Sequence, residues 1–240
     1  MIKKYILVVM VFVIFLFSTV ILKYGKETIP IEVKQVFKNE VLGSTLVKEN
    51  FEENELYSIK IYYPKTEYEN LNEYMLNSIN EVKEGFLEEI NKLDKVLNKG
   101  KYELNITFNQ YEYKSYISFA LDVMIDLRGA HPYNYIYTII YDTNSKSIIT
   151  VDKLIKNNKD FLNKISQKTY EVLKENENIK EYSDEENLEN GLKPIASNFE
   201  NIIFDKDKMI VFINIYQVAP YVAGNFEIAI PYNEIFEINM

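Results

Sequence analysis

The segment Leu127-Arg128-Gly129-Ala130-His131-Pro132-Tyr133 lies where one alternation of apolar residues stops and another begins. It contains the only arginine and the only histidine among 240 residues. Gly129 allows a positive φ, whereas Pro132 has a fixed φ and biases His131 toward an extended conformation. The segment therefore predicts a sharp, stiff loop that joins two strands.

Apolar residues alternate on both sides of this loop, as they do in strands with one buried face. We expect strands at 57–63, 102–108, 117–127, 133–141, 147–151, 199–204, 209–216 and 226–230. The alternation changes parity within 109–115, which predicts a hairpin turn or bulge there. The strands from 102 to 151 therefore predict an antiparallel meander.

Apolar residues at three- and four-residue steps predict a long amphipathic helix over 71–97, which ends at Gly100, and a second helical region over 151–175. The acidic stretch 175–190 is typical of a solvated loop or a short exposed helix. This order predicts an α+β fold: an antiparallel sheet meander with two main helices packed on one side, preceded by a single N-terminal transmembrane helix.

The N-terminus has an uncharged apolar run from Tyr5 to Leu22, flanked by lysines. As a helix this run is about 27 Å long, close to the ~30 Å thickness of the hydrocarbon core of a bilayer. A cleaved signal peptide is the alternative, but Ser18-Thr19-Val20 is a poor cleavage site. We expect an uncleaved anchor on the cell membrane that places the rest of the chain outside the cytoplasm; a cleaved segment would give a secreted protein.

The expected domain organisation follows from these features. Residues 1–4 are a cytoplasmic tip, 5–22 the transmembrane anchor or signal segment, and 23–54 a juxtamembrane spacer that can add an edge strand. The folded region divides into an N-terminal part at 55–132 and a C-terminal part at 133–240.

Composition excludes several classes of function. A formal charge of −9 argues against a nucleic-acid partner. The absence of cysteine excludes a thiolate nucleophile, and one histidine cannot hold a catalytic zinc that needs two imidazoles. We therefore expect no metal and no cofactor. A pair of carboxylates for cleaving glycosidic bonds stays possible, because 36 acidic residues are available.

Two segments contain the candidate binding residues: the loop at 127–133 described above, and a second patch rich in aromatic and small residues. The second patch is Tyr216-Gln-Val-Ala-Pro220-Tyr221-Val-Ala-Gly224, which predicts either a bulged crossing in the sheet or a shallow aromatic groove. His131 either holds its loop in shape or forms a recognition corner with Arg128. The candidates for binding a ligand or partner are Arg128, Gly129, His131, Tyr133, Tyr216 and Tyr221, and the candidates for a structural role in loops are Gly129, Pro132, Pro220 and Gly224.

Several of these motifs resemble a known family. They are Gly129-Ala130-His131-Pro132 after a long strand, Ile149-Thr-Val-Asp152-Lys-Leu154 after a turn, Phe161-Leu162 at a helix start, and Tyr216-x-x-Ala219-Pro220-Tyr221-x-Ala223-Gly224 ahead of Ile230-Pro231-Tyr232. Together they resemble the RsiV/PdaC-type extracytoplasmic domains, the paired domains of unknown function found in the lysozyme-sensing anti-sigma factor RsiV and ahead of the catalytic domain of the deacetylase PdaC. On this resemblance 55–132 is the PdaC-like part and 133–240 the RsiV-like part.

The resemblance implies a membrane-anchored, sensor-like binding module at the cell wall, with lysozyme or peptidoglycan fragments as partners. The anti-sigma factor has a cytoplasmic sigma-binding segment, and here four residues precede the apolar run, so we expect no sigma factor as a partner. The deacetylase's catalytic domain has no counterpart, so we expect a protein that is not an enzyme. The alternatives are a cell-wall enzyme that uses paired carboxylates, or a structural partner of an envelope complex.

Overall fold

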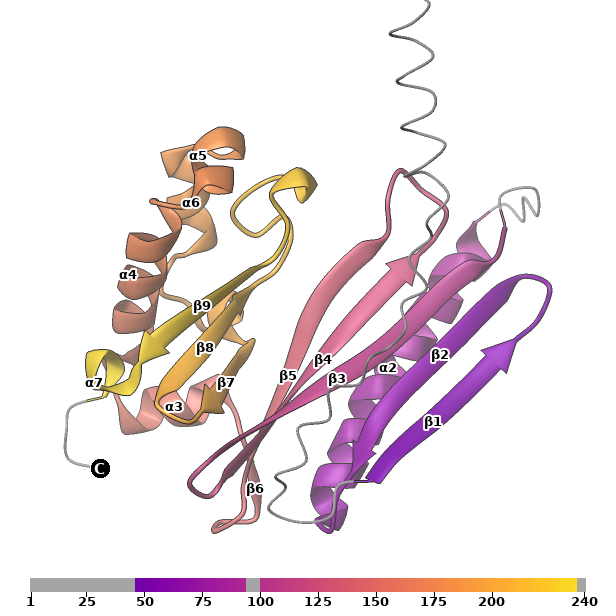
Figure 1. The fold of residues 1–240 in the computed structure, drawn as a ribbon, viewed down its shortest axis with the longest axis horizontal. Helices are drawn as coiled ribbons and strands as arrows, with labels where there is room; N and C mark the ends of the chain where they lie inside the picture. Colours follow the sequence, from indigo (N-terminus) through magenta and orange to yellow (C-terminus); the bar gives the residue numbers. More distant parts are fainter. Residues whose placement is uncertain (1–45, 94–99, 237–240) are drawn as a thin grey trace, which may run out of the picture. The chain divides into compact units, whose positions relative to one another are not determined.

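A computed structural model of the chain describes residues 46–93 and 100–236. Its strands form two sheets, a six-stranded sheet in the order β1-β2-β3-β4-β5-β6 and a three-stranded sheet in the order β7-β8-β9 (Figure 1). The strands are β1 Leu46–Glu53, β2 Tyr57–Lys65, β3 Tyr102–Tyr113, β4 Tyr116–Asp126, β5 Tyr133–Asp142, β6 Ser147–Ile149, β7 Ile202–Asp205, β8 Lys208–Ile213 and β9 Phe226–Pro231. The helices are α2 Glu69–Lys92, α3 Val151–Asn157, α4 Phe161–Leu173, α5 Glu177–Tyr182, α6 Glu185–Gly191 and α7 Tyr232–Ile235, with single 3₁₀ turns η2 Ala196–Phe199 and η3 Tyr221–Ala223.

The predicted α+β class is confirmed, and so is the antiparallel meander predicted from 102 to 151, which is β3 to β6. The prediction that all strands form a single antiparallel sheet is wrong in two respects. First, β2 and β3 run parallel, with Ile61 opposite Ile106. The long helix α2 lies between them in sequence and returns the chain to the end where β2 began, as a parallel pair requires. Second, the last three strands form a sheet of their own instead of extending the first.

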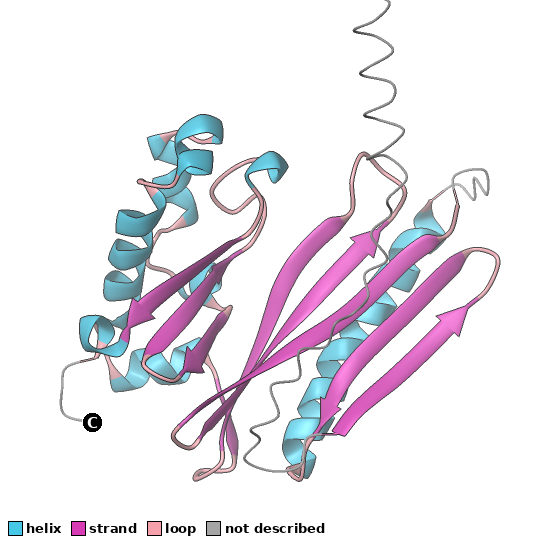
Figure 2. Ribbon diagram, viewed as in Figure 1, coloured by secondary structure: helices cyan, strands magenta, loops and turns pink. Residues whose placement is uncertain are grey.

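The helices are also divided between the two sheets (Figure 2). Apolar residues of α2 pack on the six-stranded sheet, and those of α4 pack with the three-stranded sheet. The region predicted as one helix over 151–175 is two helices, because the chain turns at Asn158–Asp160 between α3 and α4. The acidic stretch predicted as a loop or short helix forms the short helices α5 and α6.

The hairpin turn predicted within 109–115 is confirmed, and it occupies only the last two residues of that range. Strand β3 continues to Tyr113, which pairs with Tyr116, so the turn consists of Lys114 and Ser115, with Lys114 in the left-handed region at φ 54°. A two-residue turn by itself pairs even positions of one strand with odd positions of the next. Leu104 accordingly lies opposite Ile125, and no bulge is needed to explain the change of parity.

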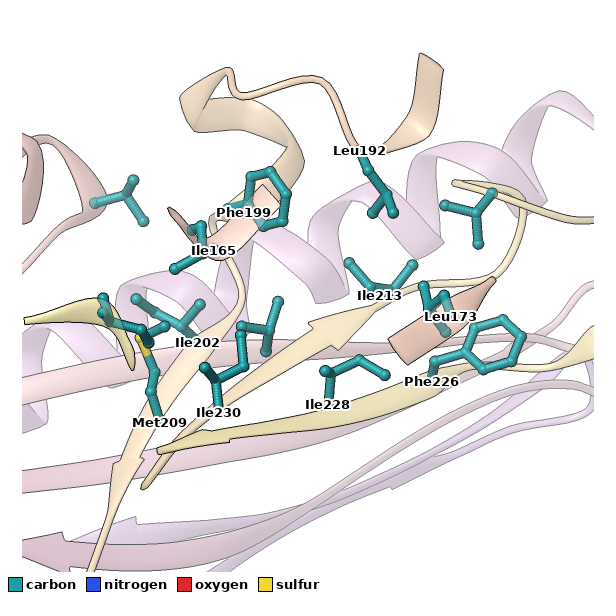
Figure 3. Close-up of a cluster of buried hydrophobic side chains, with 14 of the residues drawn as sticks. Ile165, Leu173, Leu192, Phe199, Ile202, Met209, Ile213, Phe226, Ile228 and Ile230 are labelled. Carbon is teal, nitrogen blue, oxygen red and sulfur yellow. The ribbon is translucent and has the colours of Figure 1, made fainter. Parts of the chain in front are cut away.

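The core consists of apolar clusters on the faces of the two sheets. One lies between α2 and the six-stranded sheet and includes Ile59, Met75, Phe86, Leu104 and Phe119. A second joins α4 to the three-stranded sheet, with Ile165, Leu173, Phe199, Met209, Ile213 and Ile228 among its members (Figure 3). Strand β8 is buried on both faces, since Ile210 and Phe212 pack with Ala120 of β4. The three-stranded sheet therefore contacts the six-stranded sheet as well as its own helices.

Two asparagines attach the second sheet to strand β5. Strand β6 pairs only with residues 140–142 of β5, which leaves the rest of that edge without a neighbouring strand. Asn214 accepts a hydrogen bond from the backbone N of Ile136 (2.9 Å) and donates to its carbonyl oxygen (3.3 Å), and Asn201 accepts from the backbone N of Thr138 (3.2 Å). These side chains satisfy backbone groups that would otherwise need a strand or water.

Part of the predicted domain organisation lies outside the described residues, namely the tip at 1–4, the membrane segment at 5–22 and most of the spacer at 23–54. Strand β1 belongs to the C-terminal end of that spacer and pairs with β2 at the sheet edge. Within residues 46–93 and 100–236, no helix combines the length and the apolar character needed to cross a bilayer. The division proposed between 132 and 133 falls in the loop joining β4 to β5, two neighbours in one sheet.

Candidate functional site

The loop after β4 and the loop after β8 meet at His131. The imidazole of His131 stacks on the ring of Tyr221, with centroids 3.4 Å apart and planes 16° from parallel. Its Nε2 lies 3.0 Å from the hydroxyl of Tyr216, and its Nδ1 lies 3.0 Å from the carbonyl oxygen of Pro132. A carbonyl only accepts, so Nδ1–H donates to Pro132 and Nε2 of the neutral ring accepts from Tyr216.

We call His131, Tyr216 and Tyr221 the aromatic corner. The structure thus brings together three of the predicted binding residues, although 85 positions separate the first two. The corner is open to solvent: His131 is exposed, and Tyr216 has 56% of its surface accessible. It is therefore available to a partner.

The loop between β8 and β9 has an unusual backbone that presents both tyrosines. Tyr216 has a φ of 68°, and Gly224, which follows the 3₁₀ turn η3, has a φ of 78°. Gly224 has no Cβ and adopts this conformation without a steric penalty. Tyr216 has a Cβ, so the same conformation is strained there. Pro220 precedes η3 as its N-cap. Residues held in such sparsely populated backbone conformations cluster at active sites and ligand-binding sites.

The loop after β4 has its left-handed residue at Arg128 and not at Gly129. Arg128 has a φ of 57°, whereas the φ of Gly129 lies outside the positive region, and a Cβ built on Gly129 meets nothing within 4 Å. The side chain of Asp126 provides the reason, because its Oδ1 accepts a hydrogen bond from the backbone N of Arg128 at 2.7 Å and so turns the chain at that residue.

The guanidinium of Arg128 is engaged inside the domain. It pairs with the carboxylates of Asp126 (2.9 Å) and Glu103 (2.6 Å), and its Nε donates to the carbonyl oxygen of Lys101. These contacts tie the start of β3 to the end of β4. Arg128 therefore acts here as a clamp within the sheet, and the aromatic corner forms without it.

A groove of about 690 Å³ adjoins the aromatic corner at His131. We call it the acidic groove. Residues of α2 and of the strands β4 and β5 line it together with the loop between them: Glu81, Val82, Gly85, Phe86, Glu88, Glu89, Ile125, Leu127, Gly129, His131, Tyr133, Tyr135 and Tyr137. Of the charged side chains in this described lining, all three are carboxylates and none is Lys or Arg. The groove thus combines an apolar and aromatic surface with a negative rim.

The tyrosines of β5 form one side of this groove. The rings of Tyr133 and Tyr135 lie 5.3 Å apart, and Tyr133 is 43% exposed. Burial, together with the neighbouring Tyr133 and Tyr137, raises the pKa of Tyr135 to about 12. The hydroxyl of Tyr135 is therefore protonated at neutral pH and can donate a hydrogen bond.

Sequence reasoning identified His131 and Tyr133 but missed the side of the groove that α2 provides. Glu81, Gly85 and Glu88 are spaced by four and three residues, which places them on one face of a helix. A glycine inside that polar face was the available signal, because it leaves a gap between flanking carboxylates. Within the described residues, no cluster of three or more histidine or acidic side chains is placed to hold a metal.

Residues 152–233 match the family model described as "Protein of unknown function (DUF3298)". The matched segment begins in α3, ends in α7 and includes the whole three-stranded sheet. It contributes Tyr216 and Tyr221 to the aromatic corner, and His131 lies outside it.

The chain is also similar to the "Peptidoglycan-N-acetylmuramic acid deacetylase PdaC" of Bacillus subtilis (strain 168), with 29% identity over 142 residues. The match covers 59% of this chain and 27% of that protein, so the chain spans about a quarter of the length of this relative. The predicted resemblance to PdaC-type domains containing DUF3298 is confirmed.

Two solved structures of DUF3298 family proteins are similar to the chain. One from Pseudomonas aeruginosa PAO1 matches with a TM-score of 0.55 and 12% identity, over 80% of this chain and 90% of that chain. A second, from Bacteroides fragilis NCTC 9343, has a TM-score of 0.47 and 17% identity, over 80% and 92%. The first match supports the α+β architecture beyond the DUF3298 domain itself.

Proposed function

We propose that this protein is a non-enzymatic extracytoplasmic binding module, anchored in the cell membrane by residues 5–22, which binds a cationic protein, lysozyme, in the acidic groove. The observation that carries this proposal is the groove lining, in which every charged side chain of the described residues is a carboxylate. Peptidoglycan fragments are the other candidate partner, since the PdaC relative is named for peptidoglycan.

The lining suits the long basic side chains of such a partner. The aliphatic part of a lysine or arginine can lie on the half-buried Leu127 and Val82 while its charged end reaches Glu81 or Glu88. Tyrosines such as Tyr133 offer ring faces to the same cations. Tyrosine is also enriched among the residues that dominate binding energy at protein interfaces.

The charge of the whole chain supports the same class of partner. A formal charge of −9 attracts a cationic protein and raises its association rate. Salt screens this attraction, because the Debye length is only about 8 Å at physiological ionic strength. Binding should therefore weaken as salt is added.

The arrangement of the carboxylates favours binding over catalysis. Glu81, Glu88 and Glu89 all belong to α2, and the opposite side of the groove consists of Ile125, Leu127 and tyrosines of β5. A glycosidase needs two carboxyl groups on either side of the scissile bond. No acidic side chain faces α2 across this groove among the described residues.

The test is calorimetric titration of the full-length chain in detergent micelles with lysozyme at increasing salt. Replacing Glu81 and Glu88 together by Gln should weaken binding about tenfold, because two rim charges are removed at roughly 0.2–1 kcal/mol each, with a further loss of long-range attraction. Glu84→Gln, on the same helix but outside the groove, is the matched control and should change affinity less than about twofold. Absence of lysozyme binding, or equal loss in both variants, would refute the proposal.

A further inference from the structure

A second cavity, of about 640 Å³, lies beside the turn between β3 and β4. Its lining is Tyr113, Lys114, Ser115, Tyr116, Asn144, Leu154, Asn157, Asn158, Lys159, Phe204, Tyr232 and Phe236. A smaller cavity of about 290 Å³ shares Tyr116, Leu154 and Asn157 with it and adds Ile149, Lys153 and Lys156. We call the two together the basic pocket. It shares no residue with the acidic groove.

The charges that line the basic pocket are all positive. Acidic residues outnumber basic ones in the chain, 36 to 27, yet the described lining contains four lysines and no carboxylate. Lys114, Lys156 and Lys159 form no ion pair with any described residue, and the Nζ of Lys114 lies 5.1 Å from the ring centroid of Tyr113. A pocket with unpaired lysines in an acidic protein favours an anionic ligand.

Side-chain amides add neutral hydrogen-bonding groups to this lining. Asn144 and Asn157 line the larger cavity, and their side chains form no hydrogen bond with another described residue. Each amide offers two donor hydrogens and an accepting oxygen. The pocket can therefore bind hydroxyl and acetamido groups as well as a charge.

Aromatic rings held in place by one another form the apolar part of the pocket. Tyr113 stacks on Tyr232 with centroids 4.4 Å apart and planes at 24°. Tyr116 packs edge-on against Phe204, with centroids 4.9 Å apart. The electron-rich faces of such rings attract the partly positive C–H groups on the face of a sugar ring.

We propose that the basic pocket binds a sugar that bears a carboxylate. Its aromatic rings suit the sugar ring, its asparagines suit hydroxyl and amide substituents, and Lys114, Lys156 and Lys159 suit the carboxylate. A bare phosphate ion would leave the aromatic surface unused, and a neutral sugar would leave the lysines unpaired. The volume lies in the range of ligand sites, about 300–1,000 Å³. The proposal does not depend on lysozyme binding in the acidic groove.

The experiment compares two ligands that differ by one carboxylate. N-Acetylmuramic acid is N-acetylglucosamine with an added lactyl ether, which carries the charge. With the full-length chain in detergent micelles, saturation-transfer NMR and calorimetry should show at least about fivefold tighter binding of the acid. Because the chain has no tryptophan, tyrosine fluorescence gives an independent measure of the same binding.

Charge reversal locates the site. Lys156→Glu combined with Lys159→Glu should weaken binding of the acid about tenfold and leave binding of N-acetylglucosamine within about twofold. Lys48→Glu in β1, an exposed lysine outside both pockets, is the matched control and should change neither. Circular dichroism of each variant shows whether the fold is retained, as expected for exposed side chains.

Three outcomes would overturn the proposal. They are equal affinity for the two sugars, inorganic phosphate that competes as strongly as the acid, and a charge reversal that does not affect binding. Lysozyme binding is measured with both sets of variants. It should be lost in the acidic-groove variant and kept in the lysine variant, because the two sites share no residue. Either proposal can therefore fail without the other.

Discussion

Gly191 is the position where one added methyl group should perturb the molecule most clearly. It is the last residue of α6, and it lies against the loop that follows β8. A Cβ built on Gly191 would lie 2.0 Å from the carbonyl oxygen of Gln217 and 2.8 Å from Cγ1 of Val218. The first obstacle is backbone, so no rotamer change relieves it. Gly191→Ala must move the loop or the end of the helix.

The cost can be worked from these contacts. Overpacking of this kind costs about 1–3 kcal/mol. The side chain of Gln217 also donates to the carbonyl oxygens of Gly191 (3.0 Å) and Asn198 (2.9 Å), and losing either bond costs about 1 kcal/mol. Alanine also restricts the unfolded chain more than glycine does, which offsets up to about 1 kcal/mol of this destabilisation. A net destabilisation of about 2–3 kcal/mol should lower the Tm by roughly 5–10 °C for a domain of this size.

The assay is thermal unfolding of the full-length chain in detergent micelles, followed by circular dichroism. Gly129→Ala is the matched control, because a Cβ there meets nothing within 4 Å and the backbone is not left-handed. It should leave the Tm unchanged or raise it slightly. A Gly191→Ala protein that melts within about 1 °C of the wild type would refute the steric argument.

The remaining predictions concern the loops and turns around the site. Gly129→Val should retain the wild-type Tm within about 2 °C, since the left-handed residue is Arg128; a larger loss in a melting experiment would contradict this. Arg128→Met should destabilise the fold by about 1–2 kcal/mol in urea unfolding, because it leaves two carboxylates without their partner, while lysozyme affinity stays unchanged. His131→Ala should lower stability by about 1 kcal/mol through loss of stacking on Tyr221, and loss of partner affinity with unchanged stability would instead indicate recognition alone. Partial burial raises the pKa of Asp142, but hydrogen bonds to its carboxylate, the first of them from Ser145, outweigh this and hold the pKa below its usual value. Its stabilising contribution is therefore present above about pH 4 and is lost as pH falls through the folded-state pKa. Asp142→Asn should reduce that acid sensitivity in melts between about pH 2 and 5.

Most elements could be located from sequence because their patterns are local. The alternation at Ile117, Phe119 and Leu121 marks β4, since each of these side chains packs in the cluster beneath α2. The three- and four-residue steps from Leu71 to Ile90 mark α2 for the same reason. Where local patterns were ambiguous, as over 151–175, one helix was predicted and two are present.

The pairing of strands could not be read from those patterns. An alternating strand is apolar on one face whether its neighbour is parallel or antiparallel, so the parallel pair of β2 and β3 depends on where α2 delivers the chain. The separate second sheet also escaped prediction. It is attached by Asn201 and Asn214, polar residues whose long-range hydrogen bonds to β5 leave no periodic signal.

The amino-acid sequence by itself determined the α+β class, the positions of most strands and helices, the acidic character and the resemblance to PdaC-type domains, because these follow from local periodicity, composition and short motifs. Only the tertiary structure decided that His131 meets Tyr216 and Tyr221, that Arg128 pairs inside its own sheet, and that carboxylates and lysines line separate cavities. Those facts depend on contacts between residues far apart along the chain, and the packing of two sheets determines such contacts, not the order of the residues alone.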